Sequence, residues 1–167
     1  MKPIQKPQDP LSRFSLAVFN MNGLLLRSGD RVTRSIDQSS ARWQVLGRIG
    51  HGTPTVAHIA RDMGLARQSV QRIADVLADE GLAVYREHPT DRRTKLIEIT
   101  PKGTEVLNAI YERYAKWNRH VMSRLDPQQL KNIADALEEV ERIIEKELND
   151  FGSGKPGSDH TEEGDFL

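Results

Sequence analysis

The sequence predicts a mainly α fold with a minor β part, in which a helix-turn-helix precedes a short hairpin. Apolar residues in 56–63 are spaced as one face of a helix, and Gly64 follows where a helix can end in the left-handed conformation. The same spacing recurs in 70–77 after a very short connection, and two short helices joined in this way form a helix-turn-helix. Branched and aromatic residues in 82–88 and 94–100 predict two strands around a polar turn. The complete pattern is that of a winged helix-turn-helix flanked by further helices.

The rest of the chain is organised around this winged helix-turn-helix, which we assign to residues 39–100. Apolar residues at alternating spacings of three and four run through 11–38 and 101–149, as they do along the seams of packed helices. Because these helices carry more apolar surface than one small core can cover, we interpret both stretches as a helical dimerisation region. A self-contained bundle within one chain is the alternative. We expect residues 1–10 to form a flexible arm, and residues 150–167, rich in Gly, Ser, Pro and acids, to form a disordered acidic tail.

Composition excludes several classes of protein. The 167 residues include no Cys, which excludes disulfides, cysteine-ligated zinc and a thiol redox switch. No apolar run reaches the roughly 20 residues that a membrane span needs, and the N-terminus has no apolar signal-peptide core. We therefore expect a cytoplasmic protein with no membrane partner. We find no Ser/His/Asp motif, Gly-rich phosphate loop or pair of carboxylates in a predicted cleft, and we expect no catalytic residues, metal or cofactor.

The formal net charge of zero conceals an uneven distribution of charge. Residues 149–167 hold five acids and one base, which leaves 23 Lys and Arg against 19 Asp and Glu in the rest of the chain. Basic residues gather on the first turns of the second helix of the helix-turn-helix and on the hairpin, whereas the acids of that helix lie toward its far end. Because local charge governs phosphate binding more than total charge does, this distribution favours DNA binding.

The second helix of the helix-turn-helix carries the candidate base-reading side chains. Its residues that point away from the apolar face include Arg, which can form bidentate hydrogen bonds with guanine, and Gln, which can do so with adenine. An ordinary solvated helix face is the alternative. At the hairpin tip, Arg either belongs to a plain polar turn or enters the minor groove, with Asp91 holding the neighbouring Arg by a charge-assisted bond. The predicted DNA-binding residues are Arg67, Gln68, Ser69, Gln71, Arg72, Arg86, Asp91, Arg92, Arg93 and Lys95.

Three segments resemble a known family: residues 40–46 (SARWQVL), the helix-turn-helix from Thr55 to Leu82, and the hairpin. Most specific is DRRTKL at 91–96, which leads to ITPKG at 99–103. On these segments the chain resembles, from about residue 11 to residue 148, the MarR family of transcriptional regulators. The family's Asp-x-Arg wing motif corresponds to Asp91 and Arg93.

The resemblance implies a homodimer that binds a pseudo-palindromic double-stranded DNA operator and represses transcription. It also implies a small-molecule effector, an aromatic acid or other phenolic, that binds between the dimerisation region and the winged helix and releases the DNA. Met21, Leu25, Trp43 and Tyr111 are the residues that we expect to line this effector site. Trp43 has a second interpretation from the sequence alone, as an aromatic residue of the core.

The chain departs from the family pattern at Ala66, where the start of the recognition helix usually has a small hydroxyl residue. This change removes a helix cap worth about 1 kcal/mol and one phosphate contact. The absence of Cys does not fit the peroxide-sensing branch, and the scattered His residues give no support for a zinc sensor. Three other functions stay open: a DNA binder without small-molecule input, a winged helix used only for protein contacts, and an enzyme.

Overall fold

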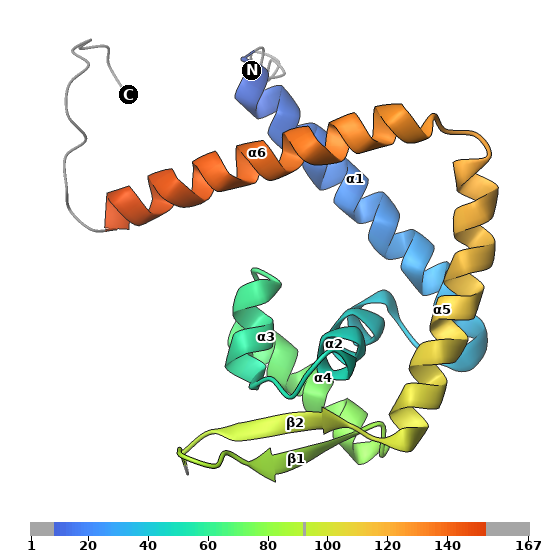
Figure 1. The fold of residues 1–167 in the computed structure, drawn as a ribbon, viewed down its shortest axis with the longest axis vertical. Helices are drawn as coiled ribbons and strands as arrows, with labels where there is room; N and C mark the ends of the chain where they lie inside the picture. Colours follow the sequence, from blue (N-terminus) through green and yellow to red (C-terminus); the bar gives the residue numbers. More distant parts are fainter. Residues whose placement is uncertain (1–8, 92, 153–167) are drawn as a thin grey trace, which may run out of the picture. The chain divides into compact units, whose positions relative to one another are not determined.

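The computed structural model describes residues 9–91 and 93–152, and its elements confirm a mainly α fold with one two-stranded sheet (Figure 1). Two compact units divide the chain, one ending at Arg119 and the other beginning at His120. The elements are α1 (Pro10–Thr33), the 3-10 helix η1 (Arg34–Ile36), α2 (Ser40–Gly50), α3 (Val56–Asp62), α4 (Arg67–Asp79), β1 (Ala83–Glu87), β2 (Lys95–Ile99), α5 (Pro101–Met122) and α6 (Pro127–Gly152).

Helix α1 begins and ends at residues whose chemistry suits those positions. The carboxylate of Asp9 accepts a hydrogen bond from the backbone N–H of Ser12 at 2.8 Å, and Pro10 occupies the first helical position. At the other end, α1 stops at Thr33 and the 3-10 helix η1 follows. Pro10, which we assigned to the arm, therefore belongs to the helix.

Helices α3 and α4 form the predicted helix-turn-helix. Gly64 lies in the turn with a φ of +61°, a conformation that side chains with a Cβ rarely adopt. The next residue, Leu65, donates its backbone N–H to the carbonyl of Ala60 at 2.9 Å and closes the turn. Ala60 and Val70 are both buried, so the small side chain of the first lets the two helices approach closely.

The wing is an antiparallel hairpin that is bound to the start of α3. Strand β1 pairs with β2 in a register that places Tyr85 opposite Ile97. The backbone N–H of Ile97 also donates to the carbonyl of Pro54 at 2.9 Å, and a β-bridge joins Leu96 to Thr55. These bonds hold the hairpin beside the helix-turn-helix.

One apolar core serves α2, the helix-turn-helix, the sheet and the start of α5. Trp43 is partly buried and packs against this core, in agreement with its interpretation as a core aromatic. The buried core residues are Val45, Leu46, Ile49, Val56, Ile59, Ala60, Val70, Ala74, Leu77, Leu82, Ala83, Ile97 and Leu107.

Helix α6 belongs to the second unit and continues further than the sequence predicts. It ends at Gly152, so residues 150–152, which we assigned to the tail, are helical. The remainder of the predicted tail, like residues 1–8 of the arm, lies outside the described residues. Within 9–91 and 93–152, no helix is long and apolar enough to cross a membrane. The exposed large apolar residues of α6 are Leu130, Ile133, Leu137, Ile143, Ile144, Leu148 and Phe151.

Candidate nucleic-acid interface

Four of the five side chains predicted on α4 lie on its exposed face. Arg67, Gln68, Ser69 and Arg72 are exposed, and none of these four has a hydrogen-bond or ion-pair partner for its side chain among the described residues. Their donors and acceptors are therefore available to another molecule. The same face becomes acidic toward its C-terminal end, where Asp75 and Asp79 lie. The hollow over this face is lined by Arg67, Gln68, Gln71, Arg72, Asp75, Val76 and Asp79.

The N-terminus of α4 has no side-chain cap. Ala66 occupies the N-cap position and makes no side-chain hydrogen bond, as its lack of a hydroxyl predicts. The backbone N–H groups of the first helical turn thus have no side-chain acceptor from this residue. Because the N-terminal end of a helix dipole is positive, this end of α4 and the Arg67 guanidinium both favour a nearby phosphate.

The fifth predicted side chain, Gln71, is half-buried and bonded within the protein. Its side-chain nitrogen donates to the carboxylate of Asp75 and to the hydroxyl oxygen of Tyr85, both at 2.8 Å, and that hydroxyl donates to Asp75 at 2.7 Å. Burial, and then the bond to the Asp75 carboxylate, raise the pKa of Tyr85. Both amide protons of Gln71 are used, so only its carbonyl oxygen is free, and a bidentate bond with adenine is not available in this conformation.

At the wing tip, Asp91 shapes the turn by bonds to its neighbours. Its carboxylate accepts the Thr94 hydroxyl at 2.8 Å and the backbone N–H of Arg93 at 3.0 Å, and these bonds lower the pKa of Asp91. The Nδ1 atom of His88 accepts the backbone N–H groups of Thr90 and Asp91 at 3.3 and 3.2 Å. Among the described residues, Asp91 thus binds the backbone of Arg93, and the bond that we expected from Asp91 to the side chain of a neighbouring Arg stays a prediction, because Arg92 lies outside them.

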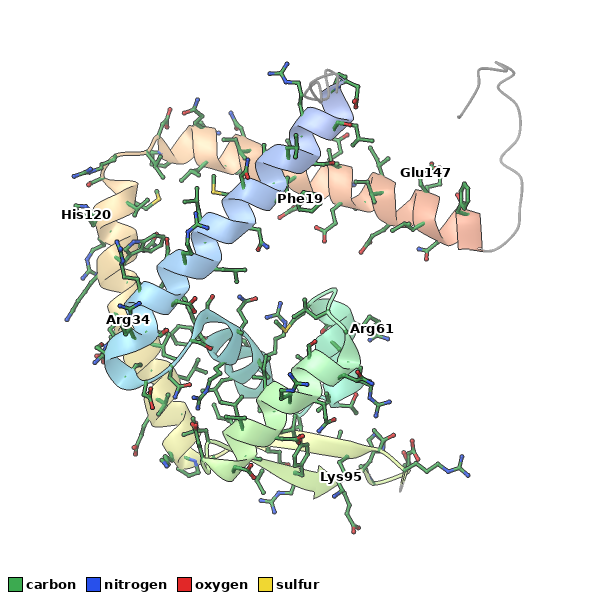
Figure 2. All side chains as sticks on the ribbon, turned by 180° about the vertical axis from the view of Figure 1, so that it is seen from behind. Phe19, Arg34, Arg61, Lys95, His120 and Glu147 are labelled. Carbon is green, nitrogen blue, oxygen red and sulfur yellow. The ribbon has the colours of Figure 1, made fainter. Side chains whose placement is uncertain are left out.

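The other predicted wing residues differ in whether their side chains form ion pairs. Arg93 and Lys95 are exposed, and neither forms an ion pair in the part of the chain that the structure describes (Figure 2 labels Lys95). The guanidinium of Arg86 instead pairs with Glu98 on the opposite strand, with 3.0 Å between Nε and Oε2. Arg92 lies outside the described residues. Among the described residues of the wing, the free cations are thus Arg93 at its tip and Lys95 at the start of β2.

A second candidate site is an apolar cavity of about 290 Å³ formed by α1, α2 and α5. Two of the four predicted effector-site residues, Leu25 and Trp43, line it, whereas Met21 and Tyr111 do not. Residues that we did not predict there are Asn22, Leu26, Ser28, Gly29, Ser40, Gln44, Tyr114 and Trp117.

Aromatic rings line one wall of this cavity. The ring centroids of Trp43 and Tyr114 are 5.0 Å apart, and those of Tyr114 and Trp117 are 5.5 Å apart. The ring of Tyr111 packs edge-on against Trp43, with 6.5 Å between the centroids, but Tyr111 does not line the cavity. Tyr114 and Trp117 do belong to an apolar seam of α5, and we took that seam as a dimer contact rather than as a cavity lining.

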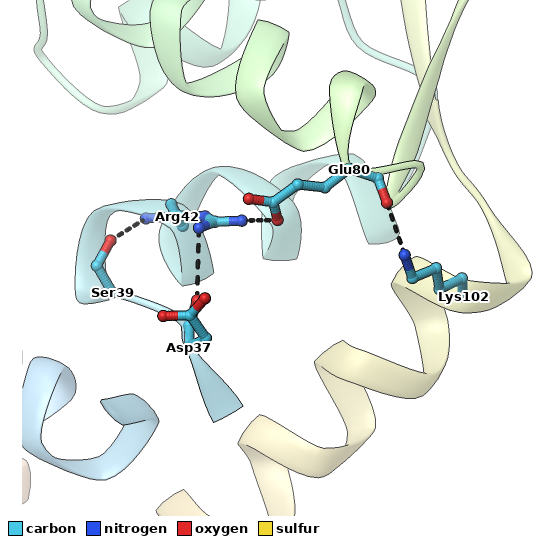
Figure 3. A network of polar contacts seen from close by, with 5 residues as sticks. All are labelled: Asp37, Ser39, Arg42, Glu80 and Lys102. Carbon is cyan, nitrogen blue, oxygen red and sulfur yellow. Dashed lines mark hydrogen bonds and ion pairs between the residues drawn. The ribbon is translucent and has the colours of Figure 1, made fainter. Parts of the chain in front are cut away.

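Polar contacts connect the cavity wall with the C-terminal end of α4. Arg42 lies between the cavity-lining Ser40 and Trp43, and its guanidinium forms an ion pair with Glu80, the C-cap residue of α4 (Figure 3). The side-chain ammonium of Lys102, in α5, donates to the carbonyl of Glu80 at 2.8 Å. The end of α4 is therefore held from both α2 and α5.

Comparisons with known proteins agree with this geometry. A family model described as the MarR family matches residues 36–94. An uncharacterized protein of Mycobacterium tuberculosis is 38% identical to the chain over 129 residues, which cover 77% of the chain and 90% of that protein.

Solved structures share the fold at low sequence identity. The structure of CouR from Rhodococcus jostii bound to p-coumaroyl-CoA matches with a TM-score of 0.67 and 19% identity, covering 80% of this chain and 95% of that one. The Staphylococcus aureus MepR–DNA complex matches with a TM-score of 0.68 and 16% identity, covering 77% of this chain and 96% of that one. At these identities the two structures support the fold alone.

Proposed function

This chain belongs to the MarR family of DNA-binding transcriptional regulators, which are not enzymes, and we propose that it is a homodimeric, effector-responsive repressor. In this proposal each protomer places one α4 in the major groove of a half-site. Two protomers then read a pseudo-palindromic operator whose half-site centres are about 10 bp, or one turn of DNA, apart. A small aromatic ligand releases the operator.

The observation that carries the proposal is the set of free side chains on α4 and the wing. Arg67, Gln68 and Arg72 face outward with no partner among the described residues, at the end of the helix where positive charge is concentrated. Arg93 and Lys95 extend the positive charge to the wing. Such a face fits a base-reading helix beside a phosphate- or minor-groove-binding wing.

Exposed apolar residues support the homodimer. Phe19 on α1 is 70% exposed and Leu148 on α6 is 67% exposed in the single chain (Figure 2 labels Phe19). Soluble proteins rarely leave large apolar patches uncovered, and a second copy of the same helices would bury them. A dimer also supplies the second α4 that a palindromic operator requires.

The effector is proposed to act through the polar contacts beside the cavity. The Asp30 carboxylate on α1 accepts the backbone N–H of Ser40 at 2.7 Å, and Arg42 of the same helix pairs with Glu80 at the end of α4. A ligand that moves α1 or α2 would thereby change the position of the recognition helix. To shift operator occupancy from nearly all to nearly none, the ligand must favour the released conformation by about 5.5 kcal/mol.

Fluorescence-anisotropy titration of labelled duplexes tests DNA reading. The protein should bind its own upstream intergenic DNA at least about 10³-fold more tightly than a random duplex, with an affinity that falls steeply with salt. Weak binding that is equal on both duplexes, at every salt concentration, would contradict an operator at that place and favour a winged helix used for protein contacts.

Substitutions separate the roles of the two surfaces. Arg93→Ala should weaken binding across all sequences and lower the salt slope by about one unit. Gln68→Ala and Arg72→Ala should change which bases are tolerated, by about 1–3 kcal/mol per base pair. Arg13→Ala, at an exposed arginine of α1, is the matched control. Equal and sequence-blind losses from all three test variants would contradict the base-reading role of α4.

A DNA binder without small-molecule input is the second candidate. It would bind the operator equally well in the presence of any aromatic acid, and no such acid would raise its melting temperature. Ligand-dependent melting combined with anisotropy therefore distinguishes the two functions.

A further inference from the structure

A second cavity, of about 470 Å³, lies next to the aromatic one and has a different chemistry. Three arginines from the end of α1 and from η1 line it: Arg27, Arg31 and Arg34 (Figure 2 labels Arg34). Its other lining residues are Leu24, Ser28, Asp30, Val32 and Trp117. We call it the arginine cavity. The sequence analysis singled out none of these three arginines.

The fold itself does not explain the three arginines. Within 9–91 and 93–152, none of them forms a side-chain hydrogen bond or ion pair. The one acid of the cavity, Asp30, already accepts the backbone N–H of Ser40. All three arginines are exposed, and Arg27 and Arg31 lie four residues apart on α1, where like charges are unfavourable and an anion between them would be stabilising. Three guanidinium groups against one carboxylate leave an excess of positive charge in the arginine cavity.

The two cavities are neighbours. Ser28 and Trp117 line both of them, so the indole of Trp117 stands at their boundary. On one side are Leu25, Trp43 and Tyr114, and on the other are the three guanidinium groups. Together, volumes of about 290 and 470 Å³ suit a ligand larger than a simple phenolic acid.

We propose that the effector is an aromatic acyl group joined to a multiply phosphorylated carrier, with the ring in the aromatic cavity and the phosphates in the arginine cavity. The proposal rests on the effector-responsive function and names the ligand class of that site. Three guanidinium groups against the Asp30 carboxylate leave two positive charges, of which a ligand carboxylate would neutralise only one, whereas a carrier with several phosphates can neutralise both. The guanidinium group also suits phosphate, because its planar donors bind two oxygens at once.

The test compares benzoyl-CoA, benzoate and CoA by isothermal titration calorimetry on the full-length protein. Benzoyl-CoA should bind at least about tenfold more tightly than either part, since it fills both cavities. Arg31→Gln should weaken benzoyl-CoA and CoA by about tenfold and leave benzoate unchanged, because it removes charge-assisted bonds to phosphate. Leu25→Ala should weaken benzoyl-CoA and benzoate but not CoA. Arg13→Gln, on the same helix but outside the cavity, should change none of the three affinities.

Two results would overturn the proposal. If benzoate binds as tightly as benzoyl-CoA and Arg31→Gln has no effect, the arginine cavity is not used. If CoA alone binds as tightly as benzoyl-CoA, the aromatic cavity takes no acyl group. Operator anisotropy in the same samples distinguishes this inference from the function on which it rests. Release by benzoate alone would leave the effector-responsive function standing, whereas a lack of operator binding without any ligand would remove both.

Discussion

The winged helix-turn-helix and the long helices α1 and α6 have apolar residues at similar spacings, but these residues have opposite surroundings. In the first region Ile49, Val70 and Ile97 are 0% exposed. In the second, Phe19 is 70% and Leu148 is 67% exposed. Periodicity thus identifies the apolar face of a helix without identifying what covers it. The winged helix-turn-helix shares one complete core with the start of α5, and we propose that a second copy of the chain covers the apolar faces of the long helices.

The largest expected effect is the loss of stability when a side chain of the buried core is shortened. Leu46→Ala removes a fully buried side chain of α2 and should lower the free energy of unfolding by about 2–5 kcal/mol, because it leaves a cavity. Leu65→Ala, at a leucine that is 46% exposed in the turn, should change it by less than about 0.5 kcal/mol. Urea unfolding followed by circular dichroism measures both values. Similar losses in the two variants would contradict the assignment of the core.

A somewhat smaller effect, on self-association, is expected at the exposed apolar face of α1. Phe19→Ala should weaken self-association by about 2 kcal/mol, as a central aromatic contact of an interface does, and leave the fold of each chain intact. Sedimentation equilibrium across a range of protein concentrations measures the dissociation constant. Asn20→Ala, at the exposed neighbouring position, is the control. A protein that is monomeric with or without Phe19 would show that the long helices need no second copy.

A still smaller effect is expected at Tyr85, which links α4 to the wing and is half-buried. Tyr85→Phe should cost about 1 kcal/mol by removing its bonds to Asp75 and Gln71. The pKa of Tyr85 is raised above its ordinary value of 10.0, so the folded protein keeps this proton while the unfolded chain loses it. Stability should therefore fall as the pH rises above about 10, and this part of the fall should be absent in Tyr85→Phe. Denaturant titrations between pH 8 and 11 measure the free energy of unfolding at each pH. The same pH dependence in the wild type and in Tyr85→Phe would contradict the raised pKa of Tyr85.

The smallest expected effect is a gain. Ala66→Ser should stabilise the protein by about 0.5–1 kcal/mol, because the new hydroxyl can accept a backbone N–H at the uncapped start of α4. Differential scanning calorimetry detects the rise in melting temperature. Ala66→Val, which adds bulk without an acceptor, is the control. If both variants change the melting temperature alike, the missing cap is not the cause.

The sequence predicts the elements of the fold better than it predicts side-chain contacts. Gly64 and the apolar spacing around it are local features, and the structure confirms the helix-turn-helix that they indicate. The bonds of Gln71 depend on Tyr85, which lies on another element, and no spacing along the chain indicates them. For the same reason Tyr114 and Trp117 were assigned to a seam, although they line a cavity whose other walls are α1 and α2.

Selection of duplexes from a random DNA library by the full-length protein tests whether paired winged helices read the DNA, because it needs no knowledge of the operator. We expect enrichment of an inverted repeat whose half-site centres lie about 10 bp apart, since two protomers place two α4 helices one turn of DNA apart. The selected duplex should also lose its affinity when about five base pairs are inserted between the half-sites. Enrichment of a single half-site, or of no sequence at all, would contradict the claim that paired winged helices read the DNA.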